Sequence, residues 1–118
     1  MSNKAEIGPP QRFLLPLSDD WQISSAAYYW KNQFGLVTVS IELNKGTTDE
    51  DIISPGFHNL AVLPEGFRPI GYTAHTAAVI KGVSTINSCY AWIYPDGRMV
   101  TQLFNTGNEV IGSISYYP

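Results

Sequence analysis

Residues 63–69 read LPEGFRP, and this stretch sets the path of the chain between two apolar runs. Each proline holds its φ at about −65° and lacks an N–H, and each pushes the residue before it toward extended backbone. Glu65-Gly66 after Pro64 suits a type II turn, because glycine accepts the positive φ that this turn needs. The stretch therefore predicts a fixed corner between two strands.

Apolar alternation predicts strands on both sides of this corner. The clearest strand lies within 34–43, where four aliphatic residues point inward, and it forms a hairpin with 27–32 around Asn32-Gln33. The four inward residues are Val37, Val39, Ile41 and Leu43. Trp21 opens a strand directly after the Asp19-Asp20 turn, so we expect it in the core.

A second hairpin joins 85–94 to 98–104 through Pro95-Asp96-Gly97, a sequence that favours a type I turn closed by a glycine bulge. Pairing across it predicts two apolar faces: Ile93 with Met99 and Ala91 with Thr101 on one, Tyr94 with Arg98 and Trp92 with Val100 on the other. A strand pair with one face in water would need only one apolar face. We therefore expect the face with Tyr90, Trp92 and Tyr94 to meet the second sheet, a neighbouring subunit or a ligand.

Length and composition complete the fold prediction. At 118 residues the chain is one domain, and ten glycines with eight prolines break it into short pieces, a pattern more typical of sandwiches than of helical bundles. Further strands are expected at 12–17, 58–63, 70–81 and 110–117, with Pro16 placing the first at an edge. The prediction is an all-β, two-sheet antiparallel β-sandwich, jelly-roll-like, of about eight strands at 12–118, after an extended arm or linker stub at 1–11.

Several function classes are disfavoured. A net charge of −3 with seven scattered Lys and Arg residues offers no basic stripe for nucleic acid. No apolar run reaches the ~18 residues of a membrane span, and the N-terminus lacks the apolar centre of a signal peptide, so we expect synthesis in a cytoplasm. The one cysteine, Cys89, lies in an apolar run and is interpreted as a buried hydrophobe.

No enzyme chemistry is indicated. Cys89 has no glycine-rich elbow or helix N-terminus to activate it, and no spacing selects a pair of carboxylates for glycoside hydrolysis. Residues 49–51 are acidic but lack the spacing of a calcium loop, and no zinc or phosphate motif is present. We therefore expect no catalytic residue, no cofactor and no metal.

Aromatic rings flanked by polar side chains are the remaining candidates for a binding site, and they suit a saccharide. Sugar C–H faces stack on rings, while sugar hydroxyls need amides or carboxylates. The candidates are Tyr28 and Trp30 near Asn32, Tyr72 with His75, and Asn87. Core or subunit packing of these rings is the alternative, and a structural or interface role is the alternative for His75. Loops at 44–57, 81–87 and 104–109 are expected to determine specificity.

The corner, the Asp-Gly hairpin and their companions resemble a known family. Trp21, then 28–31 and 36–41, the corner, the 94–98 turn and a closing strand at 111–117 occur in the order found in C-terminal head domains of phage tail fibre and baseplate proteins of Gram-positive hosts. The resemblance covers residues 13–118. It implies a homotrimer in the virion that binds a host cell-surface saccharide and meets other tail or baseplate proteins through its N-terminal end. It supplies no ligand-contacting residues.

Two other functions stay open. One is a trimerisation or capping domain that ends a fibre and binds no ligand. The other is a small carbohydrate-binding module or glycan-cleaving domain.

Overall fold

The computed structural model describes residues 10–18, 21–45, 53–81 and 85–118, and every regular element in them is a β-strand. The strands are β1 (Phe13–Leu14), β2 (Trp21–Lys31), β3 (Val37–Lys45), β4 (Gly56–Val62), β5 (Thr73–Lys81), β6 (Thr85–Ile93), β7 (Arg98–Leu103) and β8 (Glu109–Tyr116). All paired strands are antiparallel. Within these residues no helix is long and apolar enough to cross a bilayer.

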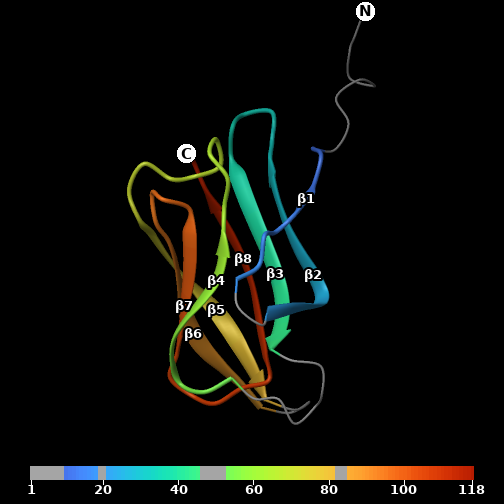
Figure 1. The fold of residues 1–118 in the computed structure, drawn as a ribbon, viewed down its shortest axis with the longest axis vertical. Helices are drawn as coiled ribbons and strands as arrows, with labels where there is room; N and C mark the ends of the chain where they lie inside the picture. The colour runs from blue at the N-terminus through green and yellow to red at the C-terminus, as the bar shows by residue number, and fades with distance from the viewer. Residues whose placement is uncertain (1–9, 19–20, 46–52, 82–84) are drawn as a thin grey trace, which may run out of the picture.

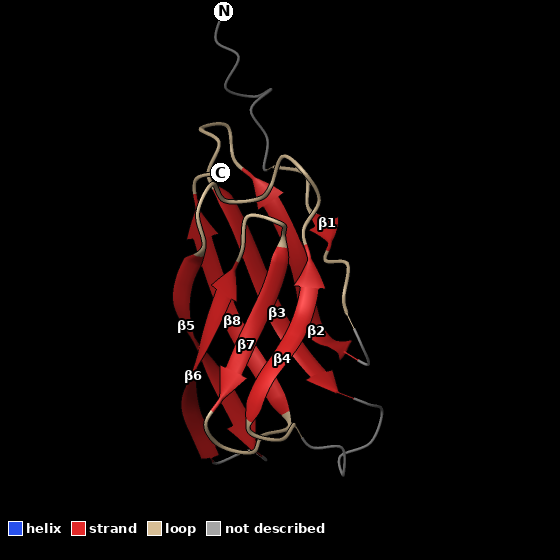
Figure 2. Cartoon of the chain, turned by 60° about the vertical axis from the view of Figure 1, so that its left-hand side comes forward, coloured by secondary structure: helices blue, strands red, loops and turns tan. Residues whose placement is uncertain are grey.

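The strands form one continuous sheet, in the order β1-β2-β3-β8-β5-β6-β7-β4, which folds over on itself. Figure 1 shows β4 to β7 on the left, β1 to β3 on the right and β8 between them. In Figure 2, β4 and β7 lie in front of β2 and β3. The predicted all-β antiparallel sandwich of about eight strands is confirmed, with the difference that its two layers are halves of one hydrogen-bonded sheet. We call β1-β2-β3-β8 the first layer and β5-β6-β7-β4 the second.

The core lies between the layers and follows from the alternation in the sequence. The four predicted inward residues of β3 are fully buried, and Trp21 at the start of β2 is buried as well. The second layer contributes Cys89, Ala91 and Ile93 from alternate positions of β6. The interpretation of Cys89 as a buried hydrophobe is thus confirmed.

The sheet folds at the junction of β5 and β8, where few residues pair. Register is kept only where Ala78 to Ile80 meet Glu109 to Ile111. Beyond this point a Cβ on Gly112 would lie 3.1 Å from the Cβ of Ala77, which is tighter than ordinary contact. Small residues on both strands therefore let the layers approach closely at the fold.

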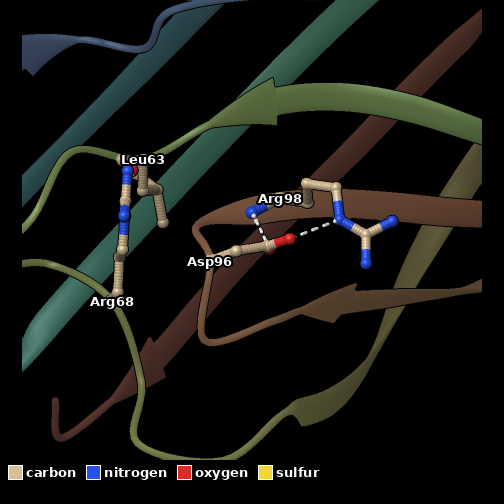
Figure 3. A network of polar contacts seen from close by, with 4 residues as sticks. All are labelled: Leu63, Arg68, Asp96 and Arg98. Atoms are coloured by element: carbon tan, nitrogen blue, oxygen red, sulfur yellow. Dashed lines mark hydrogen bonds and ion pairs between the residues drawn. The ribbon is translucent and has the colours of Figure 1, made fainter.

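The corner and the Asp-Gly hairpin contact each other directly. The corner turn is closed by Phe67 N–H donating to Pro64 O (3.2 Å), with φ +90° at Gly66 as in a type II turn. Leu63 N–H donates to Gly97 O (2.8 Å), and Arg68 Nε donates to Leu63 O (2.8 Å). Figure 3 shows Leu63 and Arg68 beside the hairpin turn.

Gly97 is required at this contact for two reasons. Its φ is +90°, and a Cβ there would lie 2.3 Å from Leu63 O and 2.7 Å from Arg68 Nε. The hairpin has the predicted partners, because Tyr94 and Arg98 are joined by a backbone hydrogen bond (3.0 Å) and Ile93, Trp92 and Ala91 pair as expected. The corner at 63–69 and the hairpin turn at 94–98 thus form one structural unit.

Residues 15–18, which we call the strap, join the two edges of the sheet. Leu15 N–H donates to Ala27 O on β2 (3.0 Å). Ser18 N–H donates to Leu60 O (2.8 Å), and Val62 N–H donates to Pro16 O (3.2 Å), both on β4. The predicted edge position of this segment is confirmed, since β1 ends the strand order. The strap also closes the side of the fold that faces away from the β5–β8 junction.

Some expectations fall outside the described residues. These are the arm up to residue 9, the Asp19-Asp20 turn, the acidic stretch 49–51, most of the 44–57 loop and the middle of the 81–87 loop.

Candidate functional site

Four aromatic side chains, three of them exposed and Trp92 half-buried, form a continuous group on the outer face of the second layer. Neighbouring ring centroids are 6.0 Å apart for Phe57 and Trp92, 5.8 Å for Trp92 and Tyr90, and 5.4 Å for Tyr90 and Phe104. Phe57 is 67% exposed, Phe104 53% and Tyr90 46%. We call these four residues the aromatic strip. Rings of this size are normally buried, so their exposure marks a candidate interaction surface.

Strand alternation places the strip on this face. Cys89, Ala91 and Ile93 turn inward on β6, so Tyr90 and Trp92 point outward. The second apolar face predicted for the hairpin therefore exists, and in the described residues the first layer does not cover it. Of the three partners expected for it, a neighbouring subunit and a ligand remain.

A pocket lies at the β5 side of the strip. Ala74 is registered opposite Trp92 and Thr76 opposite Tyr90, so small side chains form a floor beside large rings. The cavity has a volume of about 540 Å³ and is lined by these four residues and His75. Pockets that bind small ligands have volumes of about 300–1,000 Å³ and combine apolar walls with a few polar groups.

The polar groups near the strip are amides and a hydroxyl. Gln102 on β7 is registered between Phe57 of β4 and Tyr90 of β6, so the rings of the strip surround it. Asn59 lies one row away opposite Val100, and Thr76 lines the pocket. Side chains of this kind donate hydrogen bonds to hydroxyl groups and accept them from hydroxyl groups.

Among the described residues of this face, charged side chains lie only at its edge, beside the hairpin turn. Arg98 Nε contacts Asp96 Oδ2 at 2.8 Å, and the Arg98 guanidinium lies 4.7 Å from the centre of the Tyr94 ring. The Arg98 backbone N–H, together with its guanidinium, lowers the pKa of the Asp96 carboxyl. The positive charge of Arg98 is thus balanced by the negative charge of Asp96 (Figure 3).

His75 lies behind the pocket floor. Its position opposite the buried Ala91 turns the imidazole toward the inner face, and Nε2 is buried without a hydrogen-bond partner among the described residues. Burial lowers the pKa of this imidazole. Burial thus favours the neutral form of the ring. His75 lines the pocket between Ala74 and Thr76.

The six predicted site residues lie in four separate places, and the first three of them are on the first layer. Tyr28 and Trp30 point outward from the first layer, opposite Ser40 and Thr38 respectively. The Arg12 guanidinium lies 4.8 Å from the centre of the Trp30 ring. Asn32 forms the adjoining turn, where its Oδ1 accepts hydrogen bonds from the N–H groups of Phe34 (2.8 Å) and Leu36 (3.0 Å).

The remaining candidates belong to the second layer. Tyr72 is exposed just before β5, with its ring 6.2 Å from that of Tyr94. Asn87 is half-buried on β6 opposite Val79, near the opposite end of the layer from Tyr72. The structure therefore brings His75 to the pocket and does not bring the six candidates together.

Sequence reasoning missed Phe57 and Phe104 as partners of Tyr90 and Trp92. Phe57 was assigned to the 44–57 loop, whereas β4 begins at Gly56 and exposes it. Phe104 directly follows β7 and belongs to the predicted 104–109 loop, which thus contributes one ring to the strip. Beginning the expected strand 58–63 two residues earlier, at Gly56, would have placed Phe57 on the sheet.

Comparisons with known proteins identify a fold and no sequence family. No family model matches the sequence, and no curated protein is similar to it in sequence. Among solved structures, the chain is similar to the head domain of lactococcal phage bIL170, described in a study that asks whether receptor-binding domains of lactococcal phages share a common fold. The TM-score is 0.70 at 9% identity, over 92% of this chain and 98% of that one. The likeness is therefore one of fold.

Proposed function

We propose that this protein is a receptor-binding head domain of a phage tail fibre or baseplate, which binds a host cell-surface saccharide as a homotrimer. The observation that supports it most is the exposed aromatic strip with a pocket at its side, on a fold shared with a phage head domain. In this function the strip supplies the stacking surface, and Gln102, Asn59 and Thr76 supply hydrogen bonds to hydroxyl groups.

The homotrimer serves avidity. A single saccharide contact is weak, and three linked sites repeated over a virion raise the apparent affinity by several orders of magnitude without new contacts. The N-terminal end would attach the domain to other tail or baseplate proteins. In Figure 1 the first described residues leave the domain at the end where the C-terminus also lies.

Binding to cells tests the receptor role and the ligand class together. The labelled domain is added to a panel of Gram-positive cells, including lactococci, after periodate oxidation of surface sugars or after protease treatment. We expect binding that periodate abolishes and protease leaves intact. Binding lost with protease alone would contradict a saccharide receptor, and absence of binding throughout the panel would favour a trimerisation or capping domain.

Two controls complete this test. Trp92→Ala removes a ring of the strip, and Phe34→Ala removes an exposed ring from the β2–β3 turn, outside the strip. We expect loss of adsorption only for the first. Light scattering down to low micromolar concentration should give a mass of three chains, and a stable monomer would contradict the trimer.

A further inference from the structure

We infer that the aromatic strip takes an uncharged glycan chain of several sugar rings, which lies across the strands with one end in the pocket. This inference rests on the proposed saccharide binding and adds the charge class, the extent and the placement of the ligand. Three observations lead to it: the spacing of the rings, the type of polar group among them and the distribution of charge.

The rings are spaced for an extended ligand. Neighbouring centroids in the strip are 5.4–6.0 Å apart, so each ring can meet a different sugar of a linear chain. The strip crosses from β4 to β6, and the pocket floor adds β5. Three strand intervals correspond to about 14 Å, which is too long for a single sugar ring.

The ring orientations also favour a glycan over a flat partner. Tyr90 is close to perpendicular to Phe104 (89°), and Phe57 is tilted by 37° to Trp92. Rings at such angles leave hollows between them, and the pocket of about 540 Å³ lies beside them. A subunit interface is packed as densely as a protein interior, so a flat sheet-to-sheet contact would leave these hollows unfilled.

The charge distribution favours an uncharged ligand over an anionic one at the strip. Outward positions on β4 to β7, as far as the structure describes them, include one charged residue, Arg98, which is paired with Asp96 at 2.8 Å. Phosphate groups are recognised in proteins by Arg or Lys, and the whole chain has a net charge of −3. Among the described outward residues, a polymer with a phosphate in each repeat would find no cation other than the paired Arg98, whereas hydroxyl groups find Gln102 and Asn59.

The test compares two purified polymers in equilibrium binding experiments: a neutral cell-wall polysaccharide and a poly(glycerol phosphate) teichoic acid. We expect the neutral polymer to bind with an affinity that stays the same between low and high salt, since no ion pairs contribute. Trp92→Ala should weaken this binding about tenfold or more, as for truncated aromatic anchors elsewhere. Phe34→Ala should leave it unchanged, and circular dichroism with thermal melting checks that both variants are folded.

A gain-of-function variant tests the charge argument independently. Gln102→Lys places a cation among the rings, so we expect it to lose the neutral polymer and to acquire salt-sensitive binding of the teichoic acid. Stronger binding of teichoic acid by the unmodified domain would overturn the inference while leaving the proposed function intact. Competition by free choline would also overturn it, because the strip would then be a cage for a quaternary ammonium group.

Two outcomes distinguish failure of the site from failure of the function. If Trp92→Ala binds the neutral polymer as well as the unmodified domain does, the saccharide site lies elsewhere and the inference is wrong. If the domain binds no saccharide and Trp92→Ala dissociates the oligomer, the strip is a subunit interface, and both the inference and saccharide binding are refuted.

Discussion

Replacing Gly97 by alanine should lower the free energy of unfolding of this domain. Among the described glycines with positive φ, we expect the largest loss at this position. The residue has φ +90°, which costs a residue with a side chain about 1–2 kcal/mol. The added methyl would also lie 2.3 Å from the backbone oxygen of Leu63 and 2.7 Å from Arg68 Nε. Backbone cannot rotate away from such a contact as a flexible side chain could, so the corner must move.

Moving the corner weakens two hydrogen bonds, Leu63 N–H to Gly97 O and Arg68 Nε to Leu63 O, both 2.8 Å long. At about 1 kcal/mol each, they add about 2 kcal/mol to the backbone cost. The expected loss is therefore about 3–4 kcal/mol in the free energy of unfolding. The whole free energy of unfolding of a domain of this size is about 5–15 kcal/mol.

The matched control is Gly35→Ala. Gly35 has nearly the same φ, +87°, but a Cβ there would meet no atom within 4 Å. We expect it to lose only the backbone cost of about 1–2 kcal/mol. Urea unfolding followed by tryptophan fluorescence, at one fixed protein concentration, measures both variants. Equal losses for the two would refute the claim that the corner and the hairpin support each other.

Three further predictions concern single side chains. Because Arg98 lowers the pKa of Asp96, the stability that this pair contributes is present above the unfolded pKa of about 3.9 and is lost as the pH falls through the folded value; acid unfolding of Asp96→Asn should therefore depend less on pH below about 4. Tyr116→Phe removes the hydrogen bond from its hydroxyl to Phe67 O and should cost about 1 kcal/mol at pH 7 in urea unfolding. Burial raises the pKa of Tyr116, so stability falls as the pH rises above about 10, and the phenylalanine variant should lose less there. Burial likewise raises the pKa of the Cys89 thiol, so a thiol reagent should modify it only after urea unfolds the domain, and rapid reaction of the folded protein would contradict this.

The strands were predictable where local pattern and turn chemistry agree. Val37, Val39, Ile41 and Leu43 alternate cleanly and are all buried, and the Asp-Gly hairpin pairs as its sequence indicates. The strand expected from residue 70 begins only at Thr73, because Ile70 is 88% exposed in the loop that leaves the corner. Apolar character alone did not distinguish that loop from the strand.

The long-range arrangement was not predictable, because nothing local specifies which distant strands pair. β8 lies between β3 and β5, so the two layers share hydrogen bonds across the fold. The candidate site shows the same limit. Tyr90 and Trp92 were expected to face a partner, but Phe57 joins them only because β4 pairs with β7.

The strap also determines how the domain bears mechanical load. In Figure 1 the chain enters from the N-terminal side and runs along β1 toward the strap. A pull on residue 10 therefore acts along β1, and it loads the hydrogen bonds to Ala27, Leu60 and Val62 together in shear. Bonds loaded in parallel resist more force than bonds opened one at a time. If the domain binds a cell through its outer face as proposed, tension that reaches residue 10 would meet these three hydrogen bonds together.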